Sequence, residues 1–138
     1  MDDEELKART FFPTQFGTYM MVQWTGRNES RIRALCDMVL VLPDQPADMA
    51  GSIVIPDSVK ETTGAAATTG VLISCGPQAF AYDSGRQVRW EGERPKPGDR
   101  IYFQKYAGQE HRGRDGLMYR LMVDKSIAGM EEPEPTEM

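Results

Sequence analysis

The sequence predicts an all-β fold, a small β-barrel from which one long loop extends. Short runs of branched and aromatic residues recur along the chain, which is typical of strands. Turn signals separate these runs, as at Asp83-Ser84-Gly85 and Pro97-Gly98, and no long run has helical spacing. Residues 44–70 are rich in proline, glycine and small side chains, which predicts a long loop. Several short strands joined by tight turns are typical of a small barrel.

The length and charge of the chain limit its function. A chain of 138 residues forms one domain with a modest core. Its formal charge of −5 opposes simple nucleic-acid binding. Basic side chains do outnumber acidic ones between residues 86 and 120, where Tyr82, Trp90 and Tyr102 could stack on single-stranded bases. A solvated face, or charges at subunit contacts, also explains this bias. Because the rest of the chain is acidic, we expect no nucleic-acid partner.

The chain lacks the residue clusters of a metal site or a catalytic centre. Cys36 and Cys75 stand outside any CxxC motif and His111 is the only histidine, so a zinc ion would lack ligands. We expect two buried, reduced thiols, with a disulfide between them as the alternative. A histidine without a nucleophile partner is typical of a surface side chain, so we expect neither an enzyme nor a metal protein. No phosphate-binding loop is present, so this chain should not bind ATP.

No part of the sequence predicts a membrane or a secretory location. No apolar run approaches the ~20 residues that a membrane span needs. The N-terminal residues are acidic and lack the basic and apolar parts of a signal peptide. We therefore expect a cytoplasmic protein without a membrane partner.

The strands of the barrel are predicted from apolar runs that end at turn residues. Leu117, Tyr119, Leu121 and Val123 alternate and should share one face of their strand. A proline followed by glycine at residues 97 and 98 predicts a type II turn. The expected strands are residues 37–42, 71–75, 100–103 and 117–123, and a hairpin is expected at residues 80–90.

Three segments are distinguished by composition. Residues 1–31 form an N-terminal extension with an acidic start and an aromatic-rich stretch, in which residues 18–24 are expected to form a strand. This extension either packs on its own domain or on a neighbouring copy, or it is a partly ordered leader. Residues 32–130 form the barrel domain. Residues 131–138 are acidic and proline-containing, and we expect them to be disordered.

The triplet Ile53-Val54-Ile55 is the main functional candidate within the 44–70 loop. Three branched apolar residues are too few for a core helix, so the triplet is either a short barrel strand or an apolar tip on a flexible loop. Breakers surround it on both sides, including Gly51 and Pro56, and this favours the loop tip. An exposed apolar tip is typical of a site that binds another protein.

Five fragments, in order, resemble the co-chaperonins of the GroES type. Residues 32–41 are similar to the opening pattern I-R-P-L-x-D-R-V-x-V of that family, and residues 51–58 to its mobile loop, G-G-I followed by two branched residues and P-D. Residues 70–77 resemble G-x-V-x-A-V-G-P. Residues 97–103 resemble V-G-D-x-V-x-F, and residues 106–108 fit the family's Tyr-x-Gly. Each fragment alone is weak, but five in the correct order are specific.

The sequence also departs from the family pattern. Ala34 stands where the family has proline, and Met38 stands where it has arginine. The segment between residues 77 and 95 is longer than the corresponding hairpin of the family. The N-terminal extension and the acidic tail have no counterpart in the short bacterial members. The chain thus resembles a divergent member, and a long version of this kind fits a viral protein.

The resemblance implies a homo-oligomeric ring of seven copies that lids the folding chamber of a GroEL-type chaperonin.

 In that family the N- and C-terminal strands of neighbouring subunits close the ring, and ATP is bound by the chaperonin and not by the lid. The residues that match the mobile loop, and would insert between apical-domain helices of the chaperonin, are Gly51, Ser52, Ile53, Val54, Ile55 and Pro56.

The resemblance also assigns the subunit contacts and the roof of the dome. Neighbouring subunits would meet through two segments near the ends of the barrel domain, with the residues Arg33, Leu35, Asp37, Leu121, Val123 and Ile127. The hairpin at residues 78–94 would form the roof, with Tyr82, Asp83, Ser84 and Gly85 at its tip.

A structural or assembly role is the alternative function. The same barrel could serve as a component of a larger particle, such as a viral one, and the apolar N-terminal extension motivates this alternative. The resemblance itself favours a non-enzymatic co-chaperonin that assists ATP-dependent protein folding.

Overall fold

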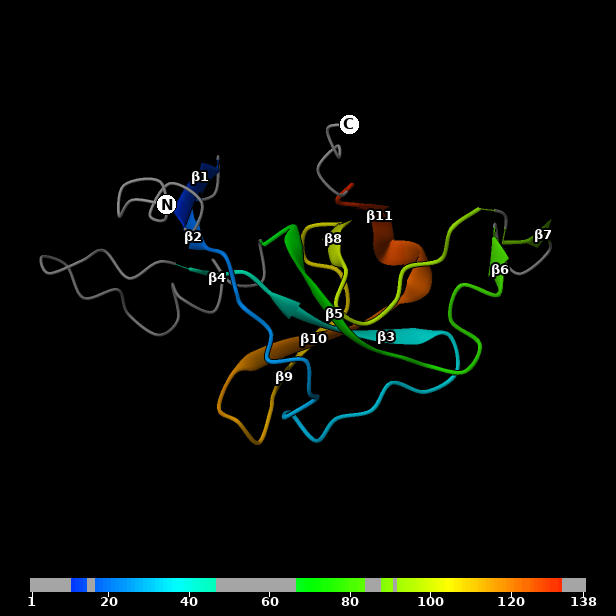
Figure 1. Ribbon diagram of the computed structural model, residues 1–138, viewed down its shortest axis with the longest axis horizontal. Coiled ribbons are helices and arrows are strands. Elements are labelled where there is room, and N and C mark those ends of the chain that lie inside the picture. The colour runs from blue at the N-terminus through cyan, green and yellow to red at the C-terminus, as the bar shows by residue number, and fades with distance from the viewer. Residues whose placement is uncertain (1–10, 15–16, 47–66, 84–87, 91, 133–138) are drawn as a thin grey trace, which may run out of the picture.

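An antiparallel sheet of six strands forms the body of the protein, in the order β11-β8-β5-β3-β10-β9 (Figure 1). The computed structural model describes residues 11–14, 17–46, 67–83, 88–90 and 92–132. Within these residues the one helix is a short 3-10 turn, η2 (Asp124–Ser126), so the all-β, GroES-like barrel class is confirmed. The strands of the large sheet are β3 (Met38–Pro43), β5 (Thr69–Cys75), β8 (Arg100–Phe103), β9 (Gln109–Arg112), β10 (Met118–Val123) and β11 (Ile127–Met130).

The large sheet is buried on both faces, because successive side chains of a strand point to opposite sides. On β3, Val39 and Val41 belong to one apolar cluster and Leu40 and Leu42 to another. The first cluster also contains residues of β5, β8, β10 and β11, namely Leu72, Ile101, Phe103, Met122 and Ile127. The second cluster lies on the other face, which would be exposed to solvent if the sheet stood alone.

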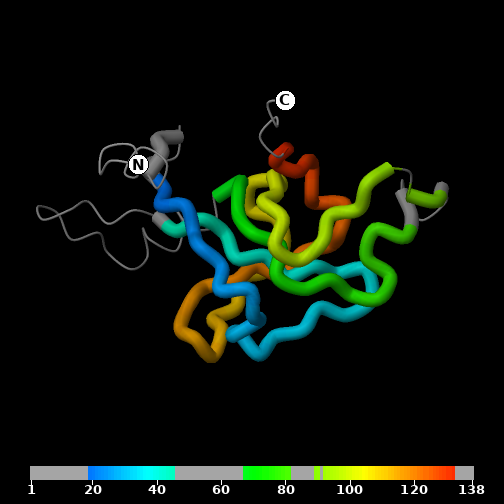
Figure 2. The backbone as a smooth tube through the Cα atoms, in the orientation of Figure 1, coloured from blue at the N-terminus to red at the C-terminus, as the bar shows by residue number. Residues whose placement is uncertain are grey.

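The N-terminal extension covers this second face. Val22 and Trp24 pack against the second cluster, together with Ile32 and the buried Ala34. Figure 2 shows this part of the chain as the blue tube that runs past the central strands before it turns into β3. Of the possibilities for the extension, packing on its own domain is therefore the one observed for these residues.

Two small sheets lie at opposite ends of the long axis of the molecule (Figure 1). One contains β1 (Phe11–Thr14), β2 (Gly17–Met20) and β4 (Gln45–Pro46), in the order β1-β2-β4. The other is the hairpin of β6 (Tyr82–Asp83) and β7 (Val88–Arg89), which confirms the hairpin expected at residues 80–90. The 44–70 loop leaves the barrel at the first end, and the hairpin projects at the second.

Most strands fall where the sequence predicts them. The turn before β8 is also confirmed, since the Asp99 amide donates to the Lys96 carbonyl at 3.0 Å and Gly98 has a φ of +100°. The strand expected at residues 18–24 is partly wrong, because β2 ends at Met20 and the chain beyond it crosses the sheet without pairing. Its apolar residues reflect packing on the second cluster and not strand pairing.

Two strands of the large sheet, β9 and β11, were not predicted, and the burial of β10 was predicted for one face only. β9 has the sequence QEHR, with no apolar residue to signal a strand, and β11 contains a glycine. On β10, Tyr119 and Leu121 share the second cluster as expected, but Met122 and Arg120 on the opposite side are also fully buried. A strand that is buried on both sides does not show simple alternation.

Candidate functional site

The candidate site is the 44–70 loop, of which the structure describes the two ends. β4 and the start of β5 lie within these bounds, and the residues 51–56 that resemble the family's mobile loop lie outside the described residues. The Asp44 amide donates to the Thr69 carbonyl at 2.9 Å, so the outgoing and returning chains are adjacent. The loop therefore begins and ends at one place on the barrel.

Asp44 is a buried carboxylate that joins four segments at the base of the loop. The Arg100 guanidinium donates to both of its oxygens, at 3.0 and 2.7 Å. The Thr69 hydroxyl donates to Oδ2 at 2.5 Å, and the Val22 amide donates to Oδ1 at 3.0 Å. The residue is only 1% exposed. A buried carboxylate with this many donors fixes the positions of all the groups around it.

Arg100 connects the loop base to the C-terminal end of the barrel domain. Its guanidinium also contacts the exposed Glu131 carboxylate at 3.2 Å. Burial lowers the pKa of Arg100, but its hydrogen bonds to Asp44 and the nearby carboxylate charges outweigh burial and raise it above its ordinary value. The Asp44 and Glu131 carboxylates therefore favour the charged form of the Arg100 guanidinium.

Arg120 holds the returning end of the loop. This fully buried side chain donates to the Ala67 carbonyl at 2.9 Å and to the Ala107 carbonyl at 3.0 and 2.6 Å. Its guanidinium carbon lies 5.1 Å from the centre of the Phe103 ring. Burial lowers the pKa of Arg120, and the charge of Glu110 offsets part of this effect. Asp44 and Arg120 thus attach both ends of the loop to the barrel.

The two segments expected at subunit contacts lie side by side in this chain. The pairing of β3 with β10 places Met38 opposite Val123, and the Asp124 amide donates to the Asp37 carbonyl at 3.0 Å. Leu35 is 59% exposed and Val123 is 36% exposed, so both offer apolar surface to a partner. Arg33 is also exposed, whereas Asp37 and Leu121 are half-buried.

Ile127 differs from the other expected contact residues because it packs inside its own chain. It is 9% exposed and belongs to the first apolar cluster. Its side chain is therefore mainly a core residue here. The apolar surface at this end of the barrel comes chiefly from Leu35 and Val123.

The hairpin expected to form the roof is attached to the barrel through Phe80. The Phe80 amide donates to the buried Asp124 carboxylate at 2.8 Å, and its ring meets the Trp90 ring edge-on at 5.3 Å between centroids. Tyr82 and Asp83 lie in β6, opposite Arg89 and Val88. Ser84 and Gly85 lie outside the described residues.

No metal-binding group emerges in the part of the chain that the structure describes. No group of three or more histidine, cysteine or acidic side chains is placed to hold a metal ion there. His111 is exposed on β9, as expected for a surface side chain. The same residues contain no helix that is long and apolar enough to cross a membrane.

The cysteines are free thiols, but the expectation that both are buried is wrong. Cys75 is half-buried at the end of β5, and burial raises its pKa. Cys36 is exposed, in a turn before β3 where its φ is +54°. Cys36 lies in the turn between Leu35 and the start of β3, where the Met38 amide donates to the Leu35 carbonyl at 2.9 Å.

Comparisons with known proteins identify the family. The family model described as chaperonin 10 Kd subunit matches residues 31–130. The chain belongs to the chaperonin 10 family. A co-chaperonin GroES of Desulfotalea psychrophila is 34% identical over 103 residues, which cover 74% of this chain and 99% of that relative.

Other GroES relatives have similar coverage. The co-chaperonin GroES of Syntrophotalea carbinolica is 33% identical over 102 residues, covering 73% of this chain and 98% of the relative. That of Neorickettsia sennetsu is 31% identical over 101 residues, covering 73% and 94%. This chaperonin 10 member is thus a divergent GroES-type chain, as its sequence fragments indicate.

Sequence reasoning missed the residues that hold the loop. Asp44 follows a proline in an irregular stretch, and Arg120 interrupts an apolar strand. The only local signal was the arginine within that strand, because a charged residue between buried neighbours requires partners. Their partners lie 56 and 53 positions away, so sequence position alone does not reveal them.

Proposed function

We propose that this chain is a co-chaperonin that caps a GroEL-type chaperonin as a ring-shaped lid and assists ATP-dependent protein folding. Its membership of the chaperonin 10 family, over residues 31–130, is the observation that carries the proposal. The lid is a homo-oligomeric ring of seven copies in the cytoplasm, and it performs no catalytic step. ATP is bound by the chaperonin partner.

The 51–56 segment is the contact with the chaperonin in this proposal. Burying a valine or isoleucine side chain contributes ~1.5–3 kcal/mol, so the triplet at residues 53–55 contributes at most ~5–9 kcal/mol. Ordering a flexible loop costs ~1–2 kcal/mol per residue fixed. A single loop therefore binds weakly. Several loops on one ring bind tightly through effective concentration, and the lid can still leave in each cycle.

The fold supports this arrangement through its two ends. The loop base and the β6–β7 hairpin lie at opposite ends of the long axis (Figure 1). Loops that leave one end of every subunit can all face a chaperonin, while the hairpins on the other side form a roof. The attachments at Asp44 and Arg120 give each loop a fixed starting point, which multivalent binding requires.

The alternative role in a larger particle loses its main support. That role was motivated by the apolar N-terminal extension, which would offer a surface for another association. Within the described residues, however, Tyr19 is 2% exposed, and Val22 and Trp24 pack on the barrel of the same chain. Their apolar surface is thus used internally, and the co-chaperonin role is the one we propose.

Single charges in the triplet test the proposal. Ile53→Asp and Ile55→Asp should leave the ring mass unchanged and abolish binding to an ATP-loaded GroEL-type chaperonin, because a carboxylate cannot enter an apolar groove without a large desolvation cost. Thr62→Asp places the same charge in the same loop outside the triplet and should bind normally. Undiminished binding by both triplet variants would refute the proposed contact. The measurement is a titration of the chaperonin, with native mass spectrometry for the ring.

A further inference from the structure

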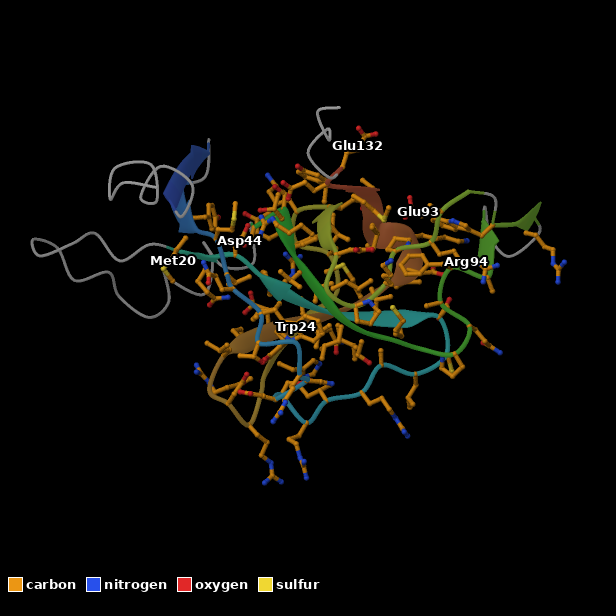
Figure 3. All side chains as sticks on the ribbon, in the orientation of Figure 1. Met20, Trp24, Asp44, Glu93, Arg94 and Glu132 are labelled. Carbon is orange, nitrogen blue, oxygen red and sulfur yellow. The ribbon has the colours of Figure 1, made fainter. Side chains whose placement is uncertain are left out.

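The N-terminal extension forms a small sheet with the first residues of the 44–70 loop. β2 pairs with β4 in antiparallel register, with Tyr19 opposite Pro46 and Met20 opposite Gln45. β1 pairs with the other edge of β2. Figure 3 shows the labelled Met20 and Asp44 at the same end of the molecule, where the loop leaves the barrel. The outgoing end of the loop is therefore the third strand of a sheet that the extension builds.

The extension is itself attached to the barrel beside this sheet. The Val22 amide donates a hydrogen bond to the Asp44 carboxylate, which also accepts hydrogen bonds from Thr69 and Arg100. Trp24 packs on the second apolar cluster, and its indole Nε1 donates to the Arg27 carbonyl at 2.8 Å. These contacts prevent β2 from moving freely with the loop. The extension can therefore hold β4 in a fixed position relative to the barrel.

The extension also reaches the group that holds the returning end of the loop. Tyr19 is 2% exposed. Burial raises its pKa, with a further increase from Tyr106 and a decrease from the Arg120 charge. Tyr19 is therefore close enough to Arg120 to feel its charge, and Arg120 donates to the Ala67 carbonyl. One residue of the extension thus lies near the side chain that holds the returning end of the loop.

The GroES relatives have little chain from which to build such a sheet. The alignment to the Desulfotalea psychrophila protein covers 99% of that relative but only 74% of this chain. The family model begins its match at residue 31, after β1, β2 and Trp24. Relative to that protein the β1–β2 hairpin is thus an addition of this chain, and it pairs with Gln45 and Pro46 at the outgoing end of the 44–70 loop.

We propose that residues 11–24 position the partner-binding loop: through the pairing of β2 with β4, they hold the base of the loop in an extended conformation. This inference rests on the proposed function. A residue of the loop base that is already ordered loses less conformational freedom when the loop binds. Gln45 and Pro46 are paired in this way, so loss of the extension should weaken binding by about tenfold or more.

A proline at Met20 separates positioning from general stability. Met20→Pro removes a backbone donor between β1 and β4 and is poorly tolerated within a sheet. Met20→Ala is the matched control, because it retains the backbone amide and removes a side chain that is 37% exposed. A second variant lacks residues 1–20 but retains Val22 and Trp24 on the barrel. Both disrupted proteins should form a ring of unchanged subunit number.

Two measurements on the full ring decide the proposal. Amide hydrogen exchange at Gln45 of the free protein should be at least tenfold faster in Met20→Pro and in the truncated chain, and unchanged in Met20→Ala. The affinity for an ATP-loaded GroEL-type chaperonin should fall about tenfold in the same two proteins. Unchanged exchange in both would overturn the positioning role, and so would faster exchange with unchanged affinity.

The proposed function and this inference can fail separately. If the unaltered chain binds no chaperonin, the proposed lid function is wrong. The exchange experiment needs no chaperonin and still shows whether the extension orders the loop base. If exchange responds as expected and binding to the chaperonin falls only in the two disrupted proteins, both are supported.

Discussion

Asp44→Asn tests whether the buried carboxylate at the loop base stabilises the protein. The substitution keeps the size of the side chain but replaces one acceptor oxygen by an amide that faces donors. The Asp44 side chain is 0% exposed and that of Arg100 is 21% exposed, so the pair is largely removed from water. Removing one partner of a buried ion pair costs about 3–5 kcal/mol. Arg100 retains Glu131 and some solvent, so we expect a loss of about 2–4 kcal/mol.

Glu131→Gln is the matched control, because it removes the other carboxylate on the same guanidinium. Glu131 is 51% exposed, and such surface pairs contribute about 0–1 kcal/mol. Urea unfolding of both variants at one protein concentration gives the two losses, since oligomers unfold in a concentration-dependent manner. Equal losses, or a loss below about 0.5 kcal/mol for Asp44→Asn, would refute the assignment of Asp44 as the main attachment of the loop base.

Two further predictions concern packing and ring assembly. A methyl group on Gly76 would lie 2.2 Å from the Cys36 carbonyl oxygen, so Gly76→Ala should lower the free energy of unfolding, measured with urea, by at least about 2 kcal/mol. Gly129→Ala is the control and should change this free energy little, because the nearest atom to its new methyl group is a side-chain carbon at 3.8 Å. Leu35→Asp should lower the ring mass in native mass spectrometry without unfolding the chain, because Leu35 is 59% exposed. Leu117→Asp is the control, because Leu117 is 41% exposed and lies just before β10, away from the proposed contact at Val123; it should leave the ring intact. An intact ring in both the Leu35→Asp and the Leu117→Asp proteins would contradict the proposed subunit contact.

Local patterns were sufficient for the class of fold and for most of the strands. β3 and β5 have branched apolar runs that end at proline or glycine, and β8 has an apolar and aromatic run that follows the turn at Pro97 and Gly98. Such runs favour strands wherever they occur. β9 could not be found in this way because its residues are polar and partly exposed. It is a strand only because β10 provides a partner for its backbone.

The candidate site was predicted in part. The sequence predicted a loop at residues 44–70 and a family-like fragment within it, and the role of residues 51–56 stays a prediction. It did not identify Asp44 or Arg120, which attach the loop, or the pairing of β2 with β4. These features are contacts between segments that are far apart in the chain, and hydrophobic periodicity describes only neighbours.

The sequence by itself determined that this is an all-β chain of the GroES type, because turn residues and apolar runs act locally, and it predicted a long loop at residues 44–70. Only the tertiary structure decided what the N-terminal extension does. From the sequence, its apolar residues could equally pack on a neighbouring copy. In the structure, Val22 and Trp24 pack on the otherwise open face of the barrel sheet. The charged residues at the loop base follow the same rule, since a buried carboxylate is stable only where the fold brings donors to it.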